Sequence, residues 1–162
     1  MKQIVVLSIL IILFLIFAPP IFASEPAFSE QEIKSLSLDK NESIYPDSMF
    51  YSVKRLKEKL GFILTSGREK KAQYLSNLLR VRFKELIYIE NSDKSGFLIE
   101  AANRYNANVG QINGNYKNVD NRIKRQVWDY ESALAKLRDK HPANSTDWLI
   151  FQQVIETTRN LE

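Results

Sequence analysis

The sequence predicts an all-α fold: an antiparallel helical bundle of four to five helices that follows an N-terminal signal segment and a linker. After residue 46, apolar residues recur at steps of three and four, the spacing of one face of an α-helix. No stretch combines alternating β-branched residues with turn signals, so we expect no sheet. The breaks between the apolar stripes are short, and short connections make consecutive helices antiparallel neighbours.

Residues 1–23 are predicted to be a secretory signal peptide. Lys2 is the only charged residue before Glu25, and residues 4–17 form an almost unbroken apolar run. The small residue Ala23 then offers a cleavage site. An uncleaved anchor is the alternative, because the run extended to Ala23 reaches the roughly 20 residues that span a bilayer. We therefore expect an extracytoplasmic protein, secreted or, if the leader is kept, membrane-anchored.

Residues 24–46 are predicted to be a linker, and residues 47–160 the helical domain. The linker mixes Ser, Glu, Asp, Lys and Pro without a sustained apolar period, so it lacks the apolar surface it would need to bury in order to fold.

The net charge then changes sign along the chain. Residues 24–50 carry two Lys and Arg against six Asp and Glu, and residues 51–90 carry ten against four. The basic block is a candidate for contact with an anionic polymer or lipid headgroups, a solvated helix face being the alternative.

Several chemistries find no support in the residues. The chain has no cysteine, which excludes disulfides, thiolate nucleophiles and cysteine-ligated zinc. His141 is the only histidine, so we expect no metal site. Neither a Gly-rich phosphate loop nor a Gly-x-Ser-x-Gly turn is present, and we expect no cofactor and no catalytic residue.

The first helix is predicted from Asp47 to Leu64, with Asp47 or Ser48 as its cap. Its apolar residues step by 4, 3, 4 and 3 and form a narrow seam that should face a partner helix; they are Met49, Val53, Leu56, Leu60 and Ile63. Tyr51 and Phe62 fall on the opposite side. Either the C-terminal helix around Trp148 covers these two aromatic residues or they form an exposed contact patch.

The second helix is predicted from the Ser66-Gly67 break, with Ser66 as its cap, to about Glu90. Arg82 occupies an unusual place in it, between Leu78 and Leu79 on the apolar face. A buried guanidinium needs a partner, and Glu85 lies three residues on along the same helix. We expect this pairing to fix the helix register; an anion site is the alternative.

The rest of the chain is predicted to add two or three helices. One stripe begins near Lys94, and a second, from Ile123 to Leu137, is out of phase with it. A turn near residues 118–121 explains the shift, and one long helix with a stutter is the alternative. A break at His141-Pro142 follows. Ser145 or Thr146 then caps a last helix.

A polar pattern runs through the first two predicted helices. It reads Pro-Asp-Ser-x-x-Tyr-x-x-Lys-Arg and then Glu, on Pro46, Asp47, Ser48, Tyr51, Lys54, Arg55 and Glu58. It continues with Lys-Lys-Ala and with an Arg and a Glu three apart, on Lys70, Lys71, Ala72, Arg82 and Glu85. The pattern resembles domain-of-unknown-function family 5667, found in exported and membrane-anchored bacterial proteins. The resemblance implies no catalytic residues and agrees with the predicted leader.

These observations predict a non-enzymatic interaction or scaffold module at the bacterial cell envelope. The candidate interaction surface consists of Tyr51, Lys54, Arg55, Phe62, Lys70, Lys71 and Arg82. The expected partner is an envelope protein or an anionic envelope polymer, with membrane contact only through the N-terminal segment. We expect no nucleic-acid partner, because the basic excess is modest and the compartment is wrong. A membrane-anchored envelope regulator and a small cell-wall hydrolase that uses carboxylates are the alternatives.

Overall fold

The computed structural model describes residues 26–36, 38, 44–116 and 121–161 of the 162-residue chain. Over these residues the protein is helical and has no strand, which confirms the predicted all-α bundle. The α-helices are α2 (Glu30–Ser35), α3 (Tyr51–Leu64), α4 (Arg68–Asn91), α5 (Leu98–Asn115), α6 (Asn121–Arg138) and α7 (Thr146–Arg159), and a 3-10 turn, η1 (Ser95–Phe97), precedes α5. None of the helices in this part of the chain is long and apolar enough to cross a membrane.

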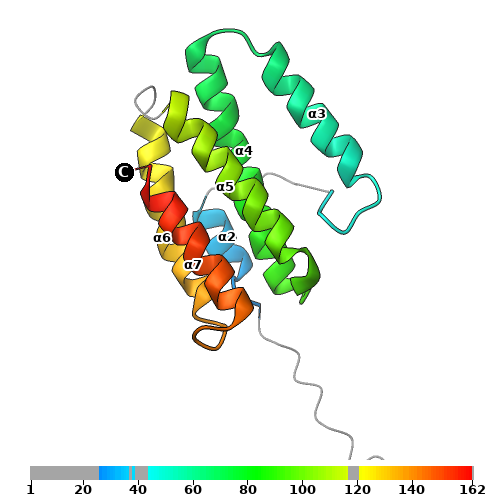
Figure 1. Cartoon of the computed structure of the whole chain (residues 1–162), viewed down its shortest axis with the longest axis vertical. Coiled ribbons are helices and arrows are strands. Elements are labelled where there is room, and N and C mark those ends of the chain that lie inside the picture. The colour runs from blue at the N-terminus through cyan, green and yellow to red at the C-terminus, as the bar shows by residue number, and fades with distance from the viewer. Residues whose placement is uncertain (1–25, 37, 39–43, 117–120, 162) are drawn as a thin grey trace, which may run out of the picture.

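Four helices close into a bundle around one core (Figure 1). Helix α4 packs against α5, α5 against α7, α7 against α6, and α6 against α4. The core side chains are almost completely shielded from solvent and come from all four helices; they include Leu75, Leu79, Phe83, Tyr105, Ile112, Tyr130, Leu134, Phe151 and Val154. The rings of Phe83 and Tyr130 stack with their centroids 4.2 Å apart, which joins α4 to α6 at the centre.

The apolar stripes after residue 94 belong to two helices. Helix α5 ends at Asn115 and α6 begins at Asn121, so the shift in phase marks a change of helix. The turn predicted near residues 118–121 lies largely outside the described residues. Ser145 is the cap of α7, since its side chain accepts a hydrogen bond from the backbone N–H of Trp148.

The two earlier caps differ from prediction. Helix α3 begins at Tyr51 after a turn, and Ser48 Oγ accepts from the N–H of Phe50 without capping the helix. Gly67 holds the N-cap position of α4 at a φ of 90°, which explains a glycine there because other residues avoid positive φ.

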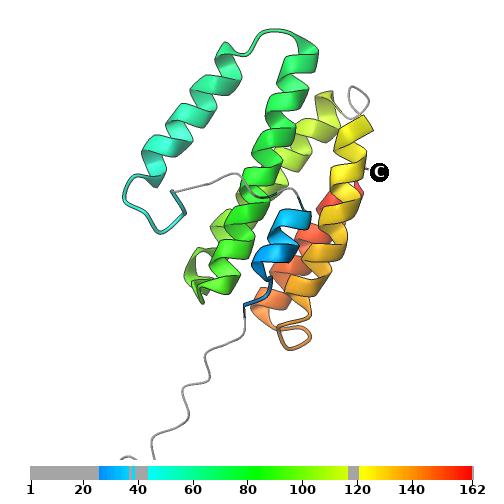
Figure 2. The same cartoon turned by 180° about the vertical axis from the view of Figure 1, so that it is seen from behind.

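Part of the predicted linker belongs to the bundle, which corrects the expectation that it lacks order. Helix α2 has a capping box in which Ser29 and Glu32 bond each other's backbone N–H. Ala27, Phe28 and Leu38 on either side of α2 are buried in the core. Figure 2 shows α2 alongside α4 and α6. Its six residues are too few to display a helical period, so the sequence alone hid it.

Helix α3 stands apart from the four-helix bundle and is joined to the start of α4 by a short connection (Figures 1 and 2). The prediction that its apolar seam faces a partner helix is wrong among the described residues. Met49 is 85% exposed, and the remaining seam residues are exposed as well. The opposite side of α3 faces the bundle, because that side carries Tyr51, which is buried.

Candidate functional site

A cluster of polar side chains, here called the polar joint, fastens α3 to α4. It consists of Tyr51, Lys54 and Glu58 on α3 and of Arg82 and Glu85 on α4. The three residues of α3 are spaced by three and four and so share one face of that helix. Arg82 and Glu85 are three apart and share the facing side of α4. The joint therefore selects which face of α3 meets the bundle.

Arg82 is at the centre of the polar joint. Its Nη1 lies 2.8 Å from Glu85 Oε1 and 3.0 Å from Glu85 Oε2, and its Nη2 pairs with Glu58. Arg82 and Glu85 are 2% and 1% exposed, so the expected buried pair is confirmed. Burial by itself would lower the pKa of Arg82, but the charges of Glu85 and Glu58 outweigh burial and raise it. The guanidinium is thus a permanent cation held by two carboxylates.

The remaining members give each carboxylate oxygen of Glu85 a second donor. Tyr51 donates its hydroxyl to Glu85 Oε2 at 2.9 Å, and Lys54 Nζ donates to Glu85 Oε1 at 3.1 Å. Burial, together with the charge of Glu85, raises the pKa of Tyr51 well above its usual value, so the phenol stays a donor. On its other side the Tyr51 ring lies 4.9 Å from the guanidinium carbon of Arg104 on α5. These contacts indicate that the polar joint serves to hold α3 against α4.

The residues of the candidate interaction surface therefore fall into three groups. Tyr51, Lys54 and Arg82 come together as members of the polar joint, and their contact with a partner stays a prediction. Phe62 is half-buried with its ring centroid 6.2 Å from that of Tyr74, and Lys71 Nζ lies 5.4 Å above the same ring. The alternative that the Trp148 helix covers Tyr51 and Phe62 is wrong, because side chains of α4 and α5 cover these two aromatic residues.

Two of the predicted residues, Arg55 and Lys70, are exposed. Arg55 lies on α3 and borders a cavity between α3, α4 and α5, whereas Lys70 lies in the first turn of α4. These are the two exposed residues among the seven candidates, and contact with a partner at any of the seven stays a prediction.

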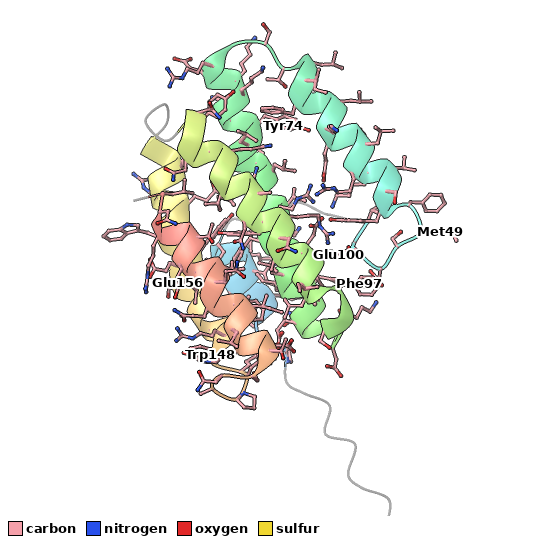
Figure 3. All side chains as sticks on the ribbon, in the orientation of Figure 1. Met49, Tyr74, Phe97, Glu100, Trp148 and Glu156 are labelled. Carbon is pink, nitrogen blue, oxygen red and sulfur yellow. The ribbon has the colours of Figure 1, made fainter. Side chains whose placement is uncertain are left out.

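The exposed side of α3, here called the outer face, was missed as a site. It consists of Val53, Leu56, Leu60, Ile63 and Leu64 on α3 and of Met49 and Phe50 in the turn before it, all between 48% and 85% exposed. Figure 3 shows side chains along α3 pointing away from the bundle, with Met49 in the turn before the N-terminal end of the helix. The signal in the sequence was the absence of acidic residues beside the stripe, since its neighbours are Arg55, Lys57 and Lys59.

Asn108 was also missed, although the same reasoning that singled out Arg82 applies to it. It lies between Tyr105 and Val109 on the buried face of α5 and is 4% exposed. Among the described residues no three His, Asp or Glu side chains are placed to hold a metal ion.

Comparison with known proteins identifies a family. A family model described as "Domain of unknown function (DUF5667)" matches residues 43–144, which include α3, α4, α5 and α6. Neither the curated proteins nor the solved structures gave a match. The matched region contains both helices of the polar joint, and Arg82 and Glu85 are among the residues on which the resemblance was noted. The chain belongs to the DUF5667 family.

Proposed function

We propose that the protein is a non-enzymatic interaction module at the bacterial cell envelope, and that the outer face of α3 rests on an anionic membrane surface. The observation that carries this proposal is the row of seven exposed apolar side chains, five on α3 and two in the turn just before it. Monomeric proteins rarely leave a contiguous apolar patch in water, and such patches mark contact sites.

The charges around the outer face favour lipid headgroups. Glu58, the acidic residue of α3, points inward to Arg82, so it does not weaken the positive charge outside. Arg55, Lys57 and Lys59 are exposed beside the apolar row. A helix with an apolar face and basic flanks is typical of binding in the plane of an anionic bilayer, where each cation near the surface contributes about 1 kcal/mol.

The same charges argue against a second copy of the chain as the occupant. Pairing two outer faces would bring the basic flanks of both helices together, and like charges across a helix pair repel. The polar joint supports the membrane proposal in another way. It holds the inner side of α3 on α4, so the outer face is presented in one orientation and does not fold back into the bundle.

The proposal extends membrane contact beyond the N-terminal segment, to which the sequence analysis had confined it. The predicted leader, cleaved or retained, would deliver α3 to the envelope. The non-enzymatic part is supported by the carboxylates of the joint: Glu58 and Glu85 are occupied by Arg82 and Lys54 and are not free to act as an acid and base pair.

The test uses the absence of native cysteine to place one fluorescent probe at a time in the full chain. An environment-sensitive dye attached through Leu60→Cys reports on the outer face, and one attached through Trp128→Cys reports on an exposed apolar position of α6. Figures 1 and 2 place α6 on the opposite side of the bundle from α3. A third probe, at Ser8→Cys in the apolar leader, reports insertion of the N-terminal segment.

With phosphatidylglycerol vesicles we expect a blue shift and quenching by brominated lipid at position 60 but not at position 128. The response should weaken in phosphatidylcholine vesicles, at high salt and in the Lys57→Glu/Lys59→Glu variant. If the probe at position 8 inserts while the probe at 60 stays in water, the membrane proposal is wrong. A blue shift at 60 without vesicles, accompanied by a doubled mass, would instead identify a second copy as the occupant.

A further inference from the structure

The inner side of α3 borders a cavity of about 530 Å³ between α3, α4 and α5. Exposed residues such as Arg55, Lys59 and Gln111 form its rim, so solutes reach it from solvent. Its volume lies within the roughly 300 to 1,000 Å³ of ordinary small-molecule sites. The cavity adjoins the outer face, because Leu56 belongs to both and Arg55 and Lys59 lie between them. Binding in the cavity is therefore tested under conditions in which the outer face is not on an anionic membrane.

Asn108 lines this cavity with hydrogen-bonding groups that the protein leaves unused. Its side chain is 4% exposed, and neither Oδ1 nor Nδ2 has a hydrogen-bond partner in the described part of the chain. Buried amides almost always have partners, because losing water without replacing it is costly. An asparagine in this state indicates that the partner comes from outside.

Arg104, one helical turn before Asn108 on α5, lines the same cavity. Its Nη1 pairs with Glu100 at 3.0 Å, whereas its buried Nε and Nη2 have no partner among the described residues. Two guanidinium donors, one amide donor and one amide acceptor therefore stand without partners in side chains that line the cavity, each atom shielded from solvent. Donors on one side of a guanidinium suit a carboxylate, which accepts two parallel bonds.

The charge and the walls of the cavity narrow the class of ligand. Arg82 is paired with Glu58 and Glu85, and Arg104 with Glu100, so Arg55 and Lys59 are the cations of the lining that favour an anion. Apolar side chains complete the lining, among them Phe62 and Leu78. A bare inorganic anion would use the cations but would leave the amide and the apolar wall without a partner.

We propose that this cavity binds the C-terminal end of a short peptide. The terminal carboxylate accepts hydrogen bonds from Arg104. The neighbouring peptide unit pairs with the Asn108 amide, donor to acceptor and acceptor to donor. An apolar side chain of the peptide rests on Phe62 and Leu78, while Arg55 and Lys59 attract the negative end from the rim.

Saturation-transfer NMR on the full chain, held in nanodiscs of neutral lipid, tests this proposal. The probes are a pool of N-acetylated tripeptides with their last two residues randomised and the same pool with the C-terminal carboxylate amidated. Acetate and inorganic phosphate serve as simple anions. We expect signal from the acid pool at millimolar concentration and at least a tenfold weaker response from the amidated pool and from either simple anion.

Two matched variants locate the site. Asn108→Leu should weaken binding of the acid pool at least tenfold while leaving the thermal transition unchanged or raised, because an apolar side chain of similar size replaces an unpaired polar one. Asn106→Leu is the control. Asn106 also lies on α5 and has a buried Oδ1 without a partner in the described region, but it does not line the cavity. Binding should survive this change.

Three results would overturn the proposal. Absence of binding by the acid pool, with the thermal transition of Asn108→Leu raised, would mean that the cavity holds only water. Equal binding of acetate or phosphate would make it a simple anion site. Equal loss in Asn106→Leu and Asn108→Leu would place the peptide elsewhere on α5.

Discussion

The α4–α7 bundle and helix α3 carry the same kind of apolar stripe, yet the stripe is buried in one region and exposed in the other. Leu79 of α4 is completely buried, whereas Leu60 of α3 is 48% exposed. The two helices differ in what their other, non-stripe side carries. Helix α3 turns its polar residues to α4 because Arg82 and Glu85 are buried there and need partners. In α3, pairing the buried charges of α4 therefore determined which side of the helix faces the bundle, and burial of the apolar seam did not.

The polar joint should give the largest effect when it is broken. Arg82→Ala leaves Glu85 buried without its main partner, and we expect a loss of about 3 to 5 kcal/mol in the free energy of unfolding, measured by chemical denaturation. Arg159→Ala is the matched control, because Arg159 pairs with Glu131 but is 55% exposed. It should cost less than about 1 kcal/mol. Similar losses in the two variants would contradict the structural role of Arg82.

The two stripes should respond differently to the same truncation. Leu79→Ala opens a hole in the core and should cost about 2 to 5 kcal/mol. Leu60→Ala removes an exposed side chain and should change the free energy of unfolding by no more than about 0.5 kcal/mol in the absence of membranes. Denaturation in urea measures both. A large loss for Leu60→Ala without vesicles would show that the outer face is covered in solution.

Loosening α3 should leave the bundle intact. Tyr74 of α4 donates its hydroxyl to the backbone oxygen of Glu58 at 2.7 Å. Tyr74→Phe removes that bond, with an expected loss of about 0.5 to 1.5 kcal/mol. Hydrogen exchange should accelerate for the amides of α3 and stay unchanged in α5 to α7. Uniform acceleration across all helices would mean that α3 and the bundle unfold as one unit.

The smallest effect concerns α2, where a surface ion pair adds to the burial of Ala27, Phe28 and Leu38 on either side of the helix. Glu32 pairs with Lys136 of α6, and its bonds to Lys136 and Ser29 lower its pKa from 4.5 to about 2. A lowered pKa in the folded state gives stability that is present above pH 4.5 and is lost as pH falls toward 2. Protection of the α2 amides, which is their exchange rate relative to an unfolded peptide at the same pH, should therefore fall over this range, and Glu32→Gln should abolish that fall. An unchanged profile in Glu32→Gln would exclude this pair as the cause.

The candidate site could be predicted only in part. Arg82 was found because a charge on an apolar helix face is visible in the sequence, and its pairing with Glu85 follows from their spacing. Glu58 and Tyr51 were not recognised as partners of Arg82, because they lie 24 and 31 residues away from it. Asn108 carries the same signal as Arg82, but its unpaired state depends on what the neighbouring helices leave uncovered.

The sequence by itself determined the helical class, the positions of α4 to α7 and the family, because helical periodicity and the motif on α3 and α4 are local properties of the chain. Tertiary structure alone decided which side of α3 faces inward, that Phe28 and Leu38 belong to the core, and that a cavity opens beside Asn108. Each of these depends on contacts between residues far apart in the chain. Periodicity shows that a helix has an apolar face, but only the competition between faces for the same neighbours shows which one is buried.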